Sequence, residues 1–194
     1  MNHYTDSLSN GLKYYFDTIH LKRKIRPVNR IDKNTSGLVI FAKNEYTQEC
    51  LIRQMNQHKF YKEYIAICNG IFNEKSGVIN APIARKENSI IERCINDDGD
   101  IAITHYEVLQ ENIKDSYSII KCILETGRTH QIRVHMQYIN HPLLGDTLYG
   151  ISSNLISRQA LHSYKCSFMH PLTKKVVEYI APIPQDMQKL INVK

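Results

Sequence analysis

A single carboxylate surrounded by cationic residues is the feature of this sequence that points most directly to chemistry. Asp32 lies between Arg30 and Lys33, and a Thr35-Ser36-Gly37 turn follows it. Nearby positive charge stabilises a carboxyl group in its ionised form, and an ionised carboxylate is suited to act as a nucleophile. The same residues also fit an exposed, solvated turn, so this segment alone leaves both interpretations open.

A second dense segment contains the run Gly127-Arg128-Thr129-His130-Gln131-Ile132-Arg133-Val134-His135. Gly127 allows a sharp turn, and we expect Thr129 to cap a short helix over residues 130–139, whose first amide groups can face an anion. His130 and Arg133 are three residues apart and therefore share a face of that helix. An arginine in this position can bind a carboxylate or a phosphate through two hydrogen bonds. The alternative is a basic helix start whose charges face solvent.

A third candidate is Tyr64, in a segment that predicts a strand over residues 61–69, closed by Gly70. A tyrosine can stack on a nucleic-acid base and still offer its hydroxyl group. An aromatic residue alone in a strand is more often part of the core, so the position has two interpretations.

Other kinds of catalytic site are not supported by the sequence. His130, His135 and His141 are five and six residues apart, which does not match the i, i+4 ligand pair of a helical zinc site. There is no Gly-x-Ser-x-Gly nucleophile elbow and no glycine-rich phosphate loop. We therefore expect neither a metal ion nor a nucleotide cofactor.

The composition is that of an ordinary globular protein. The chain has 194 residues, of which 42% are hydrophobic and 23% charged, and this fits one domain. No apolar run approaches the ~20 residues needed to cross a membrane, and the first residues do not resemble a secretory signal. Five scattered cysteines without a Cys-x-x-Cys pair indicate buried thiols in a reducing compartment. We therefore expect a cytoplasmic protein.

The positive charge suggests an anionic partner. The net charge is +6, and basic residues are concentrated in the run Lys22-Arg23-Lys24-Ile25-Arg26, shortly before Asp32. Such a cluster favours a nucleic-acid phosphate backbone that passes the same site, although it also fits a surface that confers solubility.

The elements that must position these residues alternate between helix and strand patterns. Helices are expected over residues 7–21 and, capped by Asn44, up to about residue 57. A buried strand is expected over residues 38–42, and hairpins are expected to pair residues 101–109 with 117–124 and 160–168 with 175–180. Residues 71–100 give only weak signals, with a polar turn at 95–100. The sequence thus predicts an α+β fold with a mainly antiparallel mixed sheet and flanking helices.

Taken together and in order, the motifs resemble the RluA-type pseudouridine synthases, which isomerise uridine in ribosomal or transfer RNA. That family carries its catalytic Asp in a His-Arg-Leu-Asp stretch followed by Thr-Ser-Gly, here Asn29-Arg30-Ile31-Asp32 and Thr35-Ser36-Gly37. Its Lys-x-Tyr strand corresponds to Lys62-Glu63-Tyr64, and its Gly-Arg-Thr-His-Gln-Ile-Arg-Val-His segment is unbroken from Gly127 to His135. Further matches follow at His141-Pro142-Leu143-Leu144-Gly145-Asp146, Leu148-Tyr149-Gly150, Arg158-Gln159-Ala160-Leu161-His162, Phe168-Met169-His170-Pro171 and Ala181-Pro182-Ile183-Pro184.

The resemblance implies a role for each matching residue. Asp32 is expected to be the nucleophile, Arg133 its ionic partner, and Tyr64 the residue that stacks on the target base and takes part in proton transfer. Arg30 is expected to fill the gap left when the uridine is flipped out of its helix. The remaining expected substrate and RNA contacts are Arg128, His130, Gln131, Ile132 and Leu161. The isomerisation needs no cofactor and no metal.

Two features depart from the family pattern. Asn29 replaces the usual His, and the family's catalytic domain normally begins with strands that precede this sequence. We therefore expect residues 1–194 to form a single catalytic domain without those amino-terminal strands and without a separate RNA-binding domain, and an exposed sheet edge that favours self-association. The alternative function is that of a catalytically weak or inactive RNA-binding relative with the same fold.

Overall fold

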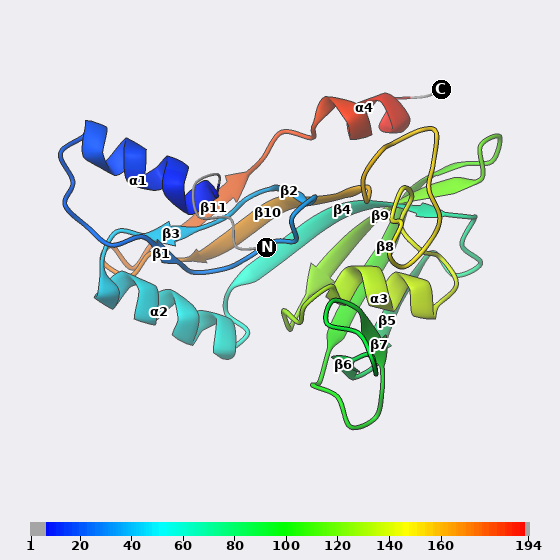
Figure 1. Ribbon diagram of the computed structural model, residues 1–194, viewed down its shortest axis with the longest axis horizontal. Helices are drawn as coiled ribbons and strands as arrows, with labels where there is room; N and C mark the ends of the chain where they lie inside the picture. Colours follow the sequence, from blue (N-terminus) through cyan, green and yellow to red (C-terminus); the bar gives the residue numbers. More distant parts are fainter. Residues whose placement is uncertain (1–6, 193–194) are drawn as a thin grey trace. The chain divides into compact units, whose positions relative to one another are not determined.

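The computed structural model describes residues 7–192 and is shown in Figure 1. The chain divides into two compact units. The first comprises Met1–Arg30, Val39–Phe60 and Phe168–Val177, and the second comprises Ile31–Leu38, Tyr61–Ser167 and Glu178–Lys194. Each unit is described by itself below. Among the described residues, no helix is both long enough and apolar enough to span a membrane.

The first unit contains two helices and one small antiparallel strand pair. Its elements are α1 (Leu8–Thr18), β1 (Arg26–Pro27), β3 (Phe41–Ala42) and α2 (Glu45–Asn56). Ser7 and Asn10 form a reciprocal capping box at the start of α1, and the Asn44 side chain accepts a hydrogen bond from the Thr47 amide at 2.8 Å. Both helices are therefore confirmed, although α1 ends at Thr18 rather than near residue 21.

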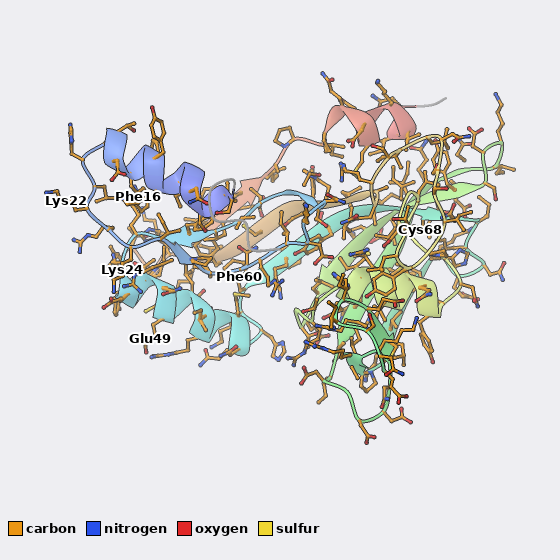
Figure 2. The ribbon with its side chains drawn as sticks, in the orientation of Figure 1. Phe16, Lys22, Lys24, Glu49, Phe60 and Cys68 are labelled. Atoms are coloured by element: carbon orange, nitrogen blue, oxygen red, sulfur yellow. The ribbon has the colours of Figure 1, made fainter. Side chains whose placement is uncertain are left out.

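Few apolar side chains hold the first unit together. Phe16 is the only residue of α1 that is buried, and the rings of Phe60 and Phe168 stack at 4.9 Å between centroids. Figure 2 labels Phe16 on α1 and Phe60 at the end of the loop that follows α2.

The buried strand expected over residues 38–42 is present only at its end. Residues 38–40 form no strand, β3 covers Phe41–Ala42, and only Ala42 of this segment is buried. A separate strand, β2 (Ser36–Gly37), precedes the segment and pairs with β10, whereas β3 pairs with β1. Residues 38–40 therefore connect two strands that belong to different sheets.

The second unit is built on a larger sheet with the strand order β11-β10-β4-β9-β8-β5, to which β2 is added on β10. The bounds are β4 (Tyr61–Asn69), β5 (Ser76–Asn80), β8 (Ile103–Asn112), β9 (Tyr117–Leu124), β10 (Leu161–Met169) and β11 (Val176–Ile180). The β4–β9, β8–β9, β5–β8 and β4–β10 pairs are antiparallel, and only β2–β10 is parallel. The predicted α+β fold, the strand over residues 61–69 and both hairpins are therefore confirmed.

Five strands and a helix were not predicted. They are β1, β2, β5, β6 (Ile83–Arg85), β7 (Arg93–Ile95) and α4 (Gln185–Ile191). β1 and β2 are only two residues long, and β5, β6 and β7 lie in the stretch where the sequence signals were weak. The polar turn expected at 95–100 is present, between β7 and β8.

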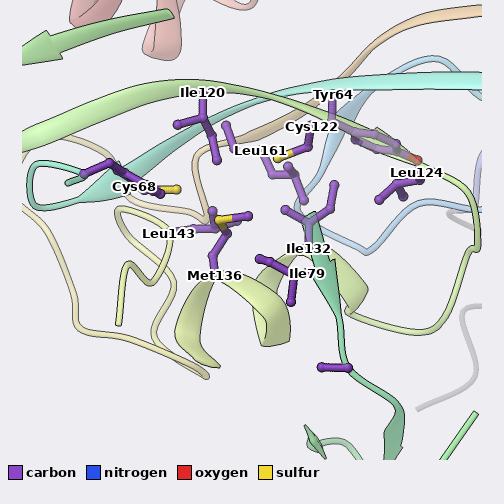
Figure 3. Close-up of a cluster of buried hydrophobic side chains, with 13 residues drawn as sticks. Tyr64, Cys68, Ile79, Ile120, Cys122, Leu124, Ile132, Met136, Leu143 and Leu161 are labelled. Atoms are coloured by element: carbon purple, nitrogen blue, oxygen red, sulfur yellow. The ribbon is translucent and has the colours of Figure 1, made fainter. Parts of the chain in front are cut away.

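Residues on opposite faces of β4 and β9 belong to two separate cores. Alternate residues of these strands pack with α3 (Gln131–Tyr138) on one side, through Ile132 and Met136, as Figure 3 shows. The residues in between pack with α4 on the other side, through Met187 and Leu190. Alternation along a strand sends successive side chains to opposite faces of a sheet, so β4 and β9 connect both layers.

The cysteines agree with the expectation only in part. Cys68, Cys122 and Cys166 are buried free thiols, whereas Cys50 and Cys94 are half-buried.

Candidate active site

The Asp32 carboxylate lies in the second unit, in the short loop before β2, and faces α3. Its Oδ2 atom is 3.4 Å from Nη1 of Arg133, and its Oδ1 atom is 4.0 Å from Nε2 of His130. The Asp32 side chain is 16% exposed, so a reactant can reach it. The structure thus brings together the three charged or titratable groups that the two sequence motifs supply.

Arg133 has a stronger partner that sequence reasoning did not identify. Its Nε and Nη2 atoms bind the two oxygens of Asp146 at 2.6 and 2.8 Å. Asp146 is almost fully buried and also accepts hydrogen bonds from the amides of Leu148 and Tyr149. This two-pronged contact occupies one edge of the guanidinium group, and the remaining nitrogen, Nη1, is left to face Asp32.

The electrostatics keep this arginine charged. Burial by itself lowers the pKa of Arg133, but the hydrogen bonds and charge of Asp146, with a further contribution from Asp32, outweigh that effect and raise the pKa above its usual value. Arg133 is therefore a fixed cation beside the Asp32 carboxylate at any pH at which the protein is folded.

His130 is held by a hydrogen bond on its other nitrogen. Its Nδ1 atom is 2.7 Å from the Tyr149 hydroxyl group, which accepts a hydrogen bond from the Arg93 amide at 2.8 Å. The hydrogen bond between the hydroxyl group and Nδ1 fixes the orientation of the ring and leaves Nε2 toward Asp32. Burial lowers the pKa of His130, the charge of Asp32 opposes this, and Arg133 adds to it. The ring is therefore neutral at pH 7.

Tyr64 lies on β4 between Ser163 of β10 and Cys122 of β9. Burial raises the pKa of its phenol to about 12; a hydrogen bond with Ser163 opposes the shift, and the charge of Asp32 adds to it. The phenol is therefore protonated at neutral pH. Tyr64, Ile132 and Leu161 belong to one apolar cluster, labelled in Figure 3.

The loop that carries Asp32 is fastened by residues just before β10. Arg158 donates to the Asn34 carbonyl oxygen at 3.1 Å, and its guanidinium group also binds both oxygens of Asp186 on α4, at 2.7 and 3.0 Å. The Gln159 amide donates to the Thr35 hydroxyl group at 3.4 Å. These contacts fix the chain two and three residues after Asp32.

Gly37 is required where β2 joins β10. It has a φ of +108°, and a Cβ atom built on it would lie 2.1 Å from the Ser163 carbonyl oxygen. That oxygen accepts a hydrogen bond from the Leu38 amide at 2.9 Å. Only glycine combines this backbone conformation with so close an approach, which gives the Thr-Ser-Gly signal in the sequence a structural explanation.

The predicted helix cap at Thr129 is wrong. Helix α3 begins after His130, which has a φ of +59° and provides no side-chain cap. Instead, Oε1 of Gln131 accepts hydrogen bonds from the Arg128 amide and the Thr126 hydroxyl group. A side chain inside the helix therefore stabilises the turn that was expected to depend on Thr129.

The remaining predicted RNA contacts occupy different environments. Gln131 is buried, and its Nε2 atom donates to the Ile103 carbonyl oxygen and the Thr104 hydroxyl group, so its polar atoms are engaged within the protein. Arg128 is exposed and donates to the Ile101 carbonyl oxygen at 3.0 Å. Arg30 is exposed and belongs to the first unit. Within residues 7–192, no group of three or more His, Cys, Asp or Glu side chains is arranged to hold a metal ion.

Several supporting residues were missed as functional positions. Asp146, Tyr149 and Arg158 were noticed as matches to the family pattern, but nothing in their spacing indicated which side chains they would contact. Ser163 carried no signal of its own.

Comparisons with known proteins give consistent results. The sequence pattern of a family described as RNA pseudouridylate synthase matches residues 2–138. The chain is 42% identical over 190 residues to "Uncharacterized RNA pseudouridine synthase YjbO" of Bacillus subtilis, covering 98% of this chain and 66% of that protein. It is 37% identical over 197 residues to "Ribosomal large subunit pseudouridine synthase D" of Haemophilus influenzae, covering 94% of this chain and 60% of that protein. The chain thus spans less than two thirds of the length of these relatives, 66% of the first and 60% of the second.

Solved structures share the fold. The structure of "Human RNA Pseudouridylate Synthase Domain Containing 1" superimposes with a TM-score of 0.77 at 24% sequence identity, covering 95% of this chain and 83% of that one. "Human RNA Pseudouridylate Synthase Domain Containing 4" gives the same TM-score at 18% identity, covering 96% and 82%.

Proposed function

Because the chain belongs to the RNA pseudouridylate synthase family, we propose that it isomerises uridine to pseudouridine in ribosomal or transfer RNA, with Asp32 as the nucleophile. The observation that carries the proposal is the ion pair at the start of α3. There Asp146 binds Nε and Nη2 of Arg133, and the remaining Nη1 atom of the guanidinium group faces the Asp32 carboxylate. An accessible carboxylate beside a fixed cation is what a carboxylate nucleophile requires.

The reaction is balanced without any outside reactant. The bond between N1 of uracil and C1′ of the ribose breaks, the base turns, and a new bond forms between C5 and C1′. C5 loses a proton and N1 gains one, so no electrons are exchanged and no water is consumed.

The other site residues have roles that follow from their environments. Arg133 keeps Asp32 ionised and oriented. Tyr64 offers a protonated phenol, which can stack on the uracil ring and donate a hydrogen bond as a proton moves. Ile132 and Leu161 exclude water from one side of the site, which strengthens the charge interactions in it.

The substrate contacts are proposed on the same basis. A uridine in a folded RNA must leave its stack to reach a carboxylate, and Arg30 fills the gap that it leaves. Arg128 and His130 contact the RNA near the target base. Gln131 contributes by supporting the turn that carries them.

A pair of variants tests the proposal. We expect purified wild-type protein to release tritium from C5 of [5-³H]uridine in ribosomal RNA or transfer RNA transcripts, because C5 loses its hydrogen when it is joined to the ribose. We expect Asp32→Asn to abolish this release while RNA binding persists. Asp98→Asn, at an exposed turn position, is the matched control and should react at the wild-type rate.

The same experiment distinguishes the proposed function from the alternative function. A catalytically inactive RNA-binding relative would bind RNA and release no tritium in the wild type. Equal release from the wild type and Asp32→Asn would show that Asp32 is not the nucleophile.

A further inference from the structure

The positive charge of this chain is concentrated in one hollow of the first unit, which is lined by none of the residues assigned above. The hollow has a volume of about 430 Å³ and lies between the segment that follows α1 and the start of α2. Five cationic side chains and one carboxylate line it: Lys22, Arg23, Lys24, Arg26, Lys43 and Glu45. Together these six side chains carry a net charge of +4, and the whole chain carries +6. A large part of the net positive charge therefore surrounds this one hollow.

Most of these cations have no carboxylate partner in the part of the chain that the structure describes. Arg26 is paired with Glu45 and donates to Gln48 at 3.3 Å. Among residues 7–192, no carboxylate lies within ion-pair distance of the other four cations of this hollow, which are Lys22, Arg23, Lys24 and Lys43. Figure 2 shows Lys22 and Lys24 on the connection between α1 and β1. Unpaired cations that surround a hollow repel one another and are stabilised by a polyanion.

The walls of the hollow are fixed even though the cations are exposed. The pairing of Arg26 with Ala42 joins β1 to β3, and Gln48 of α2 donates to the Pro27 carbonyl oxygen at 2.9 Å. A second hollow of about 510 Å³ adjoins it and shares the side chains of Lys22, Arg23 and Lys24. The cationic run therefore lines both hollows.

An exposed aromatic side chain lies in the same hollow. Tyr46 is 55% exposed and is one of its lining residues. A cationic track with an aromatic platform is the combination that binds single-stranded nucleic acid, because the cations follow the phosphates and each base can stack on a ring. A duplex offers phosphates but keeps its base faces stacked, so it cannot use Tyr46.

We propose that the hollow formed by residues 22–26 and 43–46 binds a single-stranded segment of the RNA substrate, with Lys22, Arg23 and Lys24 on successive phosphates and one base stacked on Tyr46. This inference rests on the proposed function for the identity of the ligand. The chain from Arg26 to Asp32 spans at most about 20 Å when fully extended, so the bound segment is part of the RNA near the target uridine. The hollow thus selects uridines that are flanked by unpaired nucleotides.

Binding of a labelled U₁₂ RNA oligonucleotide to the full chain, followed by fluorescence anisotropy between 50 and 300 mM salt, tests the charge contribution. Replacing Lys22, Arg23 and Lys24 together by Gln should reduce the slope of log K against log [salt] by about 2, since each single-strand phosphate contact contributes about 0.7. The control replaces Lys114, Lys175 and Lys189, which are exposed elsewhere, by Gln. It has the same net charge and should keep the wild-type slope.

Two further variants test the stacking contribution. Tyr46→Ala should weaken U₁₂ binding by about 5- to 150-fold without changing the salt slope, whereas Tyr46→Phe should stay within about threefold of the wild type. The wild type should bind a 12-base-pair RNA duplex more weakly than U₁₂, and Tyr46→Ala should leave duplex binding unchanged. Equal slopes for the two triple variants, or no loss in Tyr46→Ala, would overturn the inference.

Measuring both pseudouridine formation and U₁₂ binding distinguishes a failure of this inference from a failure of the proposed function. If the wild type forms no pseudouridine but the hollow variants lose U₁₂ binding, the hollow is an RNA site and the proposed function fails. If the wild type forms pseudouridine and the hollow variants bind U₁₂ as the wild type does, only the inference about the hollow fails.

Discussion

Replacement of Asp146 by Asn would test the site through a residue that is not expected to touch the substrate. The Asp146 carboxylate contacts Nε and Nη2 of Arg133 at 2.6 and 2.8 Å, and the side chains of Asp146 and Arg133 are only 1% and 8% exposed. An amide keeps the shape but removes the charge and turns one acceptor toward Arg133 into a donor. The guanidinium group would then be a buried cation with Asp32 as its remaining carboxylate partner.

The expected loss of stability follows from this geometry. Removing one partner of a buried ion pair costs about 3–5 kcal/mol, and Asn retains one acceptor, so we expect a value near the lower end, about 3 kcal/mol. For a chain of this size, 1 kcal/mol shifts the melting temperature by about 2–4 °C. Asp146→Asn should therefore melt about 6–12 °C below the wild type and lose most of its activity, because Arg133 is free to turn.

Asp32→Asn is the matched comparison. Its carboxylate is more exposed and makes a single 3.4 Å contact with Arg133, so the loss should be about 0–1 kcal/mol and the melting temperature should fall by less than about 4 °C. Activity should nevertheless disappear. The chain contains no tryptophan, so unfolding is best followed by circular dichroism. An Asp146→Asn variant that melts with the wild type and keeps its activity would refute the reasoning that the two-pronged contact with Asp146 positions Arg133.

Three other outcomes follow from the structure. Gly37→Ala should be strongly destabilised and inactive, because its Cβ atom would meet the Ser163 carbonyl oxygen at 2.1 Å; a variant with wild-type melting and activity would contradict the close approach. The difference in absorbance at 295 nm between the wild type and Tyr64→Phe should show no phenolate step below pH 10, since the pKa of Tyr64 is raised to about 12. Burial lowers the pKa of His130, His135 and His162, so the unfolded chain takes up protons first. The melting temperature should therefore fall as the pH decreases from 7 to 5, and a constant value would argue against buried neutral histidines.

The elements that could be predicted from sequence are those whose signals are local. The largely apolar runs in residues 61–69 and 117–124 give β4 and β9, because each strand is buried between two apolar layers. Ser7 and Asn44 mark helix starts because a cap acts within three residues. In contrast, residues 38–42 have the apolar pattern of one strand, but only Phe41–Ala42 finds a strand partner, in β1, and this pairing is not visible in the local sequence.

The same limit applies to the site. Asp32 and Arg133 are 101 residues apart, and only the resemblance to a family connected them in advance. The two-pronged partner of Arg133 lies 13 residues after it in a loop, where no helical or strand spacing relates the two side chains. Arg133 needs a carboxylate beside it because it is almost inaccessible to solvent. Its burial is a property of the folded chain, so the sequence alone could not identify Asp146 as its partner.

The position of the proposed nucleophile depends on residues that are distant in sequence. Strand β2 is only two residues long, and so short a strand cannot fix a loop by its own pairing. Arg158 holds the Asn34 carbonyl oxygen and is itself held by Asp186 of α4, while Ser163 accepts the Leu38 amide on the other side of β2. The segment around residues 158–163 thus holds β2 on both sides, and this fixes the chain that directly follows Asp32. A substitution at Arg158 should therefore act on turnover through the geometry of Asp32, although Arg158 itself does not contact the Asp32 carboxylate.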